Sequence, residues 1–248
     1  MSLIDYAKAK IKFLLRPTYY FYWQTSYKGN KYACPICGNS ADKFMPHGII
    51  KRANAECPYC HSLERHRLQW IYMKDKTNLF KKKLSILHFA PEAAFSSKLL
   101  SLKNINYLSC DLYDKKVMLK ADITNLPFKD NSFDVVLCNH VLEHIVNDSL
   151  AMSEVFRILK KDGWAILQVP IDYKRKFTFE DPTVVSPSER LKLFGQEDHV
   201  RIYGSDYKDK LKTAGFKVEV KDFAKTLAPQ LISKYLLDED ELIYYCTK

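Results

Sequence analysis

The sequence predicts an α/β fold, a doubly wound and mostly parallel sheet of seven strands, with a small cysteine-rich module in front of it. From residue 84 onward, short apolar segments alternate with stretches of helical periodicity, as in a sheet with helices on both faces. Ahead of residue 67 the chain carries two closely spaced pairs of cysteines. The 248 residues suffice for one large domain and one small one.

We expect four parts along the chain. They are a basic and aromatic N-terminal segment (1–32), a cysteine module (33–66), a linking helix (67–83) and a main domain (84–248) with an insertion at 171–204. Residues 3–15 combine a rough helical period with interleaved lysines, which predicts an amphipathic helix that lies on the chain itself, on RNA or on a membrane. Residues 17–32, rich in tyrosine and tryptophan, are expected to be extended.

The elements of the main domain follow from apolar runs and their flanking residues. We expect strands at 84–89, 106–110, 117–121, 133–138, 164–169, 216–222 and 241–247. We expect helices at 62–80, 92–103, 147–160, 205–214 and 229–237. Gly163 is expected directly after a helix end, and the irregular insertion has the length of a lid or substrate loop.

The net charge and the cysteine content limit the classes of function that we expect. Residues 1–90 hold 16 Lys+Arg and 5 Asp+Glu, a net charge of +11, whereas residues 91–248 hold 23 and 24. The basic third is either a surface that attracts nucleic acid or anionic lipid, or a solvated face without a partner. Cys110, Cys138 and Cys246 lie in apolar segments and are expected to be buried thiols. We therefore expect a cytoplasmic protein without a disulfide framework, signal peptide or membrane-spanning helix.

The paired cysteines form the most specific motif in the sequence. They are CPIC (Cys34 and Cys37) and CPYC (Cys57 and Cys60), with 19 residues between the inner two. Two such turns direct four thiolates at one point, which suits tetrahedral Zn²⁺. We expect a closed, structural zinc ribbon, in which His61 is only a competing ligand. Free cysteines or a redox pair fit the spacing less well.

Acidic residues at strand ends predict a ligand site. Parallel sheets bind ligands beyond the carboxyl ends of their strands, near the point where strand order reverses. Asp111 follows the second predicted strand and could accept hydrogen bonds from a ribose diol. Asp122, followed by Ile123, closes the third and suits the amino group and ring face of adenine. Aspartates are also common turn formers at such positions.

These segments resemble the class I S-adenosylmethionine-dependent methyltransferases, and among them the type 11 group. The resemblance rests on CDLY (110–113), ADITNLPFKDNSFDVVLCNHVLEHI (121–145), EVFRILKKDGWAILQVP (154–170) and KTAGFKVEV (212–220). It covers about residues 84–248 and implies a Rossmann-like methyltransferase domain that binds S-adenosylmethionine. Some bacterial members also carry a cysteine-pair module in front, with text like CPYCHSLERHR, HFAPE and FGQEDHVRIYG.

The first turn departs from the pattern of that family. The glycine-rich motif after the first strand is replaced by FAPEAAF, in which Ala90 and Pro91 form the turn and Glu92 enters the helix. We expect the site to be retained with altered geometry. The predicted cofactor-binding residues are Phe89, Ala90, Pro91, Glu92, Asp111, Leu112, Asp122, Ile123, Asn139 and His140.

His140 and Glu143, which follow the fourth strand, are the predicted catalytic residues. His144 follows the same strand and faces the expected cleft, and we expect it to pack or cap the next helix. His199, Arg201 and Tyr203 form a second polar cluster that suits an anionic or sugar-like acceptor or an ordinary loop ion pair.

The function expected is in-line methyl transfer to an acceptor that the sequence does not identify, either a small molecule or saccharide or RNA bound through the basic third. The alternative is a non-catalytic module that binds nucleic acid or protein, with a degenerate methyltransferase domain.

Overall fold

The computed structural model describes residues 16–48 and 50–248, which divide into two compact units. One unit holds the cysteine module, residues 92–98 and residues 223–241; the other holds residues 78–91, 99–222 and 242–248. The helix expected at 3–15 lies outside the described residues, so it stays a prediction, as does a nucleic-acid partner of the basic third. Within the described part, no helix is both long enough and apolar enough to span a membrane.

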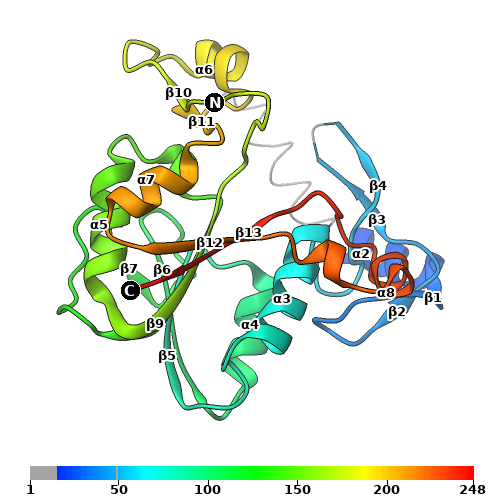
Figure 1. The fold of residues 1–248 in the computed structure, drawn as a ribbon. Helices are drawn as coiled ribbons and strands as arrows, with labels where there is room; N and C mark the ends of the chain where they lie inside the picture. Colours follow the sequence, from blue (N-terminus) through cyan, green and yellow to red (C-terminus); the bar gives the residue numbers. More distant parts are fainter. Residues whose placement is uncertain (1–15, 49) are drawn as a thin grey trace. The chain divides into compact units, whose positions relative to one another are not determined.

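The first unit is built from short hairpins and helices (Figure 1). Strand β1 (Lys28–Ala33) pairs antiparallel with β2 (Ser40–Ala41), and β3 (Met45–His47) pairs antiparallel with β4 (Arg52–Glu56). The helical elements of this unit are α2 (Arg16–Ser26), α3 (Glu64–Lys76), η2 (Ala224–Thr226) and α8 (Pro229–Tyr235). Each cysteine pair lies at the end of a hairpin strand, so the backbone pairing fixes where the thiols point.

The prediction of an extended chain at 17–32 is wrong for its first half, because α2 is a helix. Its aromatic residues favour strands by propensity, yet they are spaced four apart. The rings of Tyr19 and Trp23 meet edge to face at 5.8 Å, and those of Trp23 and Tyr27 at 4.6 Å. Gln24 also donates a hydrogen bond to the carbonyl of Pro58 at 3.0 Å. Pairing of aromatic rings four residues apart therefore outweighs the strand propensity of the individual residues.

The second unit contains a seven-stranded sheet in the order β12-β13-β9-β8-β5-β6-β7. Its strands are β5 (Leu84–Phe89), β6 (Ile105–Asp111), β7 (Leu119–Lys120), β8 (Phe133–Asn139), β9 (Leu159–Gln168), β12 (Lys217–Lys221) and β13 (Ile243–Thr247). All pairs are parallel except those made by β13, which runs antiparallel to both neighbours. The predicted mostly parallel sheet is confirmed, and its strand order reverses at β5, between β6 and β8.

Helices α5 (Asp148–Ile158) and α7 (Tyr207–Thr213) lie on the same side of this sheet (Figure 1). Their apolar residues join one core with the buried residues of β8 and β9. Met152 and Val155 of α5 are 1% exposed, and Leu211 of α7 is fully buried. Helix α4 (Ala93–Ser101) contributes residues to both units. The apolar residues that recur at helical spacing in these segments are thus the ones that face the sheet.

The prediction that Gly163 directly follows a helix end is wrong. Helix α5 ends at Ile158, and β9 begins at the next residue, so Gly163 lies inside the strand. The pairing of β8 with β9 shifts register between Phe133 and Val135, which marks a bulge opposite this glycine. A Cβ at position 163 would lie 2.9 Å from the carbonyl of Asp134. The glycine is therefore needed for close backbone approach at a bulge.

The insertion at 171–204 has more structure than expected. It contains α6 (Pro187–Phe194) and a short antiparallel pair, β10 (Phe179–Glu180) with β11 (Arg201–Ile202). Ser186 caps α6 by accepting from the amide of Glu189, and Gly195 ends the helix with a φ of 83°. The insertion thus has secondary structure of its own and can hold side chains in fixed positions.

Candidate functional site

A cavity of about 550 Å³ lies at the carboxyl ends of β5, β6, β7 and β8. This is the point where strand order reverses, which is where doubly wound sheets bind their ligands. Its lining residues are Phe89, Ala90, Cys110, Asp111, Leu112, Tyr113, Ala121, Asp122, Ile123, His140, Val141, His144, Ile145, Arg190 and Asp198. Four strand ends and the insertion therefore contribute to one cavity.

Asp111 ends β6 and lines the cavity. Its Oδ1 accepts hydrogen bonds from the amides of Tyr113, at 2.6 Å, and Asp114, at 2.8 Å. These bonds fix the turn that follows the strand. They use one carboxylate oxygen, and the described residues place no hydrogen bond on the other. The side chain can thus form the turn and still accept from a ligand.

Asp122 has the same construction two residues after the end of β7. Its Oδ1 accepts from the amide and from the hydroxyl of Thr124, each at 2.8 Å. The side chain is exposed and lines the cavity beside Ile123, which is only 3% exposed. A carboxylate next to an apolar wall suits a flat ring with an amino substituent.

The turn after β5 holds alanine in a glycine-like conformation. Ala90 has a φ of 43°, in the left-handed region that non-glycine residues rarely adopt. Its amide donates to the carbonyl of Cys110 at 2.9 Å, which ties the turn to the end of β6. The backbone here has the local conformation that a glycine would supply, with one methyl group added at the cavity wall.

Seven of the ten residues predicted to bind a cofactor line this cavity: Phe89, Ala90, Asp111, Leu112, Asp122, Ile123 and His140. Pro91 and Asn139 are outside the lining set, and Asn139 is buried within β8. Glu92 belongs to the other compact unit, where its carboxylate lies 3.7 Å from Nε2 of His66. The assignment of these three residues to a cofactor stays a prediction.

The two residues predicted to be catalytic pair with each other. Nδ1 of His140 lies 3.2 Å from Oε1 of Glu143, a side chain that is 1% exposed. His140 has a φ of 54°, and its amide donates to the carbonyl of Gln168 at 2.8 Å. Like Ala90, it is a non-glycine residue in the left-handed region at a strand end that lines the cavity. Backbone strain of this kind is common at functional sites.

Two polar residues at the cavity, Arg190 and Asp198, were not assigned to it from the sequence. His144, expected to pack or cap the next helix, lines the cavity together with Arg190 of α6 and Asp198. Nδ1 of His144 lies 3.3 Å from Oδ2 of Asp198. Nothing in the sequence places Arg190 and Asp198 there, because no local pattern shows that the insertion returns to the strand ends.

Two residues of the predicted cluster of His199, Arg201 and Tyr203 are not free to bind an acceptor. Arg201 is 3% exposed and donates to the carbonyls of Leu142 and Val146. Tyr203 is fully buried and donates to Asp148 at 2.8 Å. Burial, followed by the charge of Asp148, raises the pKa of Tyr203 well above its usual value. Arg201 and Tyr203 therefore serve the fold.

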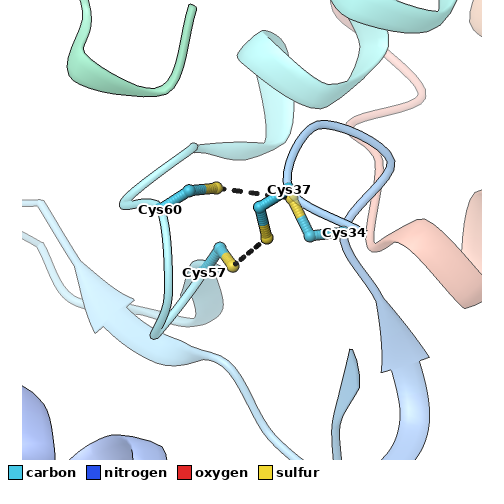
Figure 2. A group of neighbouring side chains, drawn as sticks. All are labelled: Cys34, Cys37, Cys57 and Cys60. Atoms are coloured by element: carbon cyan, nitrogen blue, oxygen red, sulfur yellow. Dashed lines mark hydrogen bonds between the residues drawn. The ribbon is translucent and has the colours of Figure 1, made fainter. Parts of the chain in front are cut away.

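The four paired cysteines form a second site, in the other unit (Figure 2). Sγ of Cys34 lies 3.5 Å from Sγ of Cys60, and Sγ of Cys37 lies 3.8 Å from Sγ of Cys57. A tetrahedral ion with Zn–S bonds of about 2.3 Å requires S–S separations of about 3.8 Å. The donor set and its spacing thus fit a closed tetrahedral metal site.

The two turns that carry these cysteines repeat one backbone pattern. The amide of Gly38 donates to the carbonyl of Cys34 at 2.9 Å, and that of His61 donates to Cys57 at 3.0 Å. Both donors have positive φ, 81° for Gly38 and 62° for His61. Nδ1 of His61 lies 2.8 Å from Glu56, and His61 is not among the group of ligand atoms within 4.8 Å of one another, which is the four sulfurs. Two copies of one turn therefore supply two thiols each.

The sheet order, the single antiparallel strand and the cavity at the reversal point define a Rossmann-like methyltransferase fold. Residues 95–167 match the family model of the type 11 group, described as "Methyltransferase domain".

The uncharacterized protein MJ0638 of Methanocaldococcus jannaschii is 53% identical over 55 residues, which cover 22% of this chain and 24% of that protein. The uncharacterized methyltransferase YcgJ of Bacillus subtilis is 34% identical over 77 residues, which cover 31% of this chain and 28% of that protein. The chain therefore spans about a quarter of the length of the curated relatives it matches.

The solved structure of the cyclase SpnF is similar with a TM-score of 0.52 and 13% identity, over 75% of this chain and 83% of that one. At this identity the similarity shows the fold alone. Because a cyclase shares the fold, the activity must be argued from the site.

Proposed function

We propose that this chain is an S-adenosylmethionine-dependent methyltransferase with a structural zinc ribbon. The observation that carries the proposal is one cavity at the sheet reversal point with an aspartate at the end of β6 and another two residues after the end of β7. Two acceptors at neighbouring strand ends match the ribose hydroxyls and the adenine amino group of an adenosyl ligand. The match of residues 95–167 to a methyltransferase domain supports the same function.

In this assignment S-adenosylmethionine supplies an electrophilic methyl group, so the protein's own residues bind, orient and exclude water. Asp111 accepts from the ribose hydroxyls through the carboxylate oxygen that the turn leaves free. Phe89 and Ile123, each 3% exposed, form apolar walls. His140 lines the cavity and is oriented by Glu143, which suits it to take a proton from an acceptor.

Burial keeps Cys110 out of this chemistry. The thiol lines the cavity, and burial together with the charge of Asp111 raises its pKa to about 11. A protonated thiol is a poor nucleophile. We therefore assign no covalent step to it.

A binding experiment with a matched control tests the function. Asp111→Asn keeps an oxygen for the turn but replaces the free acceptor with an amide, so S-adenosylhomocysteine should bind about 10–100 times more weakly in calorimetry. Asp114→Asn is the control, because Asp114 makes a similar turn, with its Oδ1 accepting from Lys116, outside the cavity lining.

Equal affinity in wild type and Asp111→Asn would remove the ribose assignment. Absence of any thermal shift of the wild-type protein with S-adenosylmethionine or S-adenosylhomocysteine would favour the alternative of a non-catalytic module.

We further propose Zn²⁺ as the ion of the four-cysteine site and a structural role for it. Four thiolates complete a tetrahedral shell and leave no open position for a substrate. The hairpins around the site are short, so metal binding supplies a large part of their folding free energy.

A further inference from the structure

A second group of metal-ligating side chains lies beside the cavity. The potential ligand atoms of Glu143, His144 and His199 all lie within 4.8 Å of one another. Glu143 and His144 belong to the short helix η1 (Leu142–His144), and His199 precedes β11 in the insertion. The amide of Val200 donates to the carbonyl of Glu143 at 2.9 Å, which fixes one segment against the other.

The carboxylate of Glu143 has one oxygen that is available to a cation. Its side chain is 1% exposed, and Oε2 is buried without a hydrogen-bond partner within the described residues. Its other oxygen, Oε1, is held by Nδ1 of His140 at 3.2 Å. Burying a carboxylate oxygen without a partner is unfavourable, because nothing offsets the desolvation of a charged group. A metal ion bound by Oε2 would offset that cost.

The two histidines are arranged as metal ligands usually are, with one ring nitrogen fixed by an outer partner. Nδ1 of His144 lies 3.3 Å from the carbonyl oxygen of Asp198 and 3.3 Å from its Oδ2. His199 is hydrogen-bonded to the backbone of Phe194. The two rings lie 4.7 Å apart and nearly perpendicular, at 82°. Each histidine therefore keeps one nitrogen for a ligand.

We infer that Glu143, His144 and His199 bind a divalent transition-metal ion at the wall of the cavity. Two imidazoles and one carboxylate suit Zn²⁺, Co²⁺, Fe²⁺ or Ni²⁺ better than Mg²⁺ or Ca²⁺, which prefer oxygen ligands. Three protein ligands leave coordination positions open, and His144 is the ligand that lines the cavity. Building on the proposed function, we assign the ion to orienting an acceptor through one of its oxygen atoms.

Cobalt titration tests the site separately from methyl transfer. The probe is Co²⁺ added to the full chain after Zn²⁺ has been loaded on the four cysteines. The absence of thiolate-to-cobalt absorption shows that the cysteine site stays with zinc. We expect one further equivalent of Co²⁺ to bind in calorimetry and to produce a weak visible spectrum typical of nitrogen and oxygen ligands.

Three variants define the ligand set. Glu143→Gln and His144→Asn should each weaken this binding by at least about 100-fold, because loss of an outer partner alone costs about 10–100-fold. His144 is 30% exposed, so its variant is expected to fold even where the buried glutamate variant does not. Glu197→Gln removes an exposed carboxylate two residues from His199 and should leave Co²⁺ affinity unchanged.

Absence of the further equivalent overturns the inference, as does a further equivalent that His144→Asn does not weaken. Calorimetry with S-adenosylhomocysteine in the absence of Co²⁺ is run in parallel. If the nucleoside binds and Co²⁺ does not, only the metal inference fails; if Co²⁺ binds and the nucleoside does not, only the proposed function fails.

Discussion

Nη1 of Arg201 donates a hydrogen bond to the carbonyl oxygen of Leu142 at 2.9 Å, across 59 residues of sequence. Nη2 of the same side chain donates to the carbonyl of Val146, also at 2.9 Å. The guanidinium is 3% exposed and thus holds both ends of the segment that contains Glu143 and His144. A residue of the insertion therefore braces the chain that leaves the fourth parallel strand.

Replacing Arg201 with leucine should destabilise the second unit by about 3–5 kcal/mol, because the carbonyls it satisfies would be left unpaired. Arg175→Leu is the control, since Arg175 is 44% exposed and pairs with Asp172 at 3.1 Å. Its replacement should lower the free energy of unfolding by less than about 1 kcal/mol. Urea unfolding measures the free energies, and hydrogen exchange at residues 142–146 localises the loss. Similar costs for the two variants would argue against the brace.

The strands of the sheet could be predicted because the apolar residues of each segment reflect its burial in the sheet. The strand at 84–89 was predicted with the bounds that the structure has, and those at 133–138 and 216–222 within one residue at each end. Asp111 and Asp122 were predicted at the cavity because their place at strand ends is a local property of the sequence.

The features that were not predicted depend on contacts that no local sequence pattern indicates. Arg201 was predicted either to bind an acceptor or to form a loop ion pair, since no local pattern shows that its donors reach carbonyls 55–59 residues earlier. Helix α2 could not be predicted from the strand propensity of its tyrosines and tryptophan, because the helix places aromatic rings four residues apart in contact. Arg190 and Asp198 enter the cavity only because the insertion folds back toward the strand ends.

Ala90→Gly and Ala90→Val should move stability in opposite directions. The left-handed conformation at φ 43° costs an alanine about 1–2 kcal/mol. Because the unfolded state of an alanine chain has less backbone entropy than that of a glycine chain, part of this cost is offset, and Ala90→Gly should raise the free energy of unfolding by up to about 1 kcal/mol. Valine, which is β-branched, should lose about 1–3 kcal/mol and weaken S-adenosylhomocysteine binding, because its methyl groups lie at the cavity wall. Thermal unfolding and calorimetry measure both effects. A valine variant as stable as wild type would show that the turn is not strained.

Cys37→Ser should abolish tetrathiolate metal binding. Removal of one of four sulfurs opens the shell, so the charge-transfer absorption of thiolate-bound Co²⁺ should fall by more than tenfold. Amide exchange in α3, which follows the second cysteine pair, should accelerate at the same time. Cys246→Ala is the control: it removes a fully buried thiol in β13 and lowers stability without changing the absorption. An unchanged cobalt spectrum in Cys37→Ser would contradict the four-sulfur assignment.

Glu154 should contribute a pH-dependent part of the stability of the second unit. Oε1 accepts from Nε of Arg157 at 2.7 Å, and Oε2 accepts from the amide of Leu126 at 2.8 Å. The hydrogen bond from Arg157 is the main cause that lowers the pKa of Glu154 in the folded state. Because the folded pKa lies below the unfolded one, the stabilisation is present above the unfolded pKa of about 4.3 and is lost as pH falls through the folded value.

We therefore expect Glu154→Gln to lower the free energy of unfolding on the order of 1 kcal/mol at pH 7, after allowance for solvent screening, and to lose this difference below about pH 4. Urea unfolding from pH 3 to 7 measures the difference, with Glu239→Gln, at an exposed position, as the control for the loss of one acidic group. A difference between wild type and Glu154→Gln that stays constant across this range would mean that the packing of the side chain, and not its charge, holds the segment at Leu126.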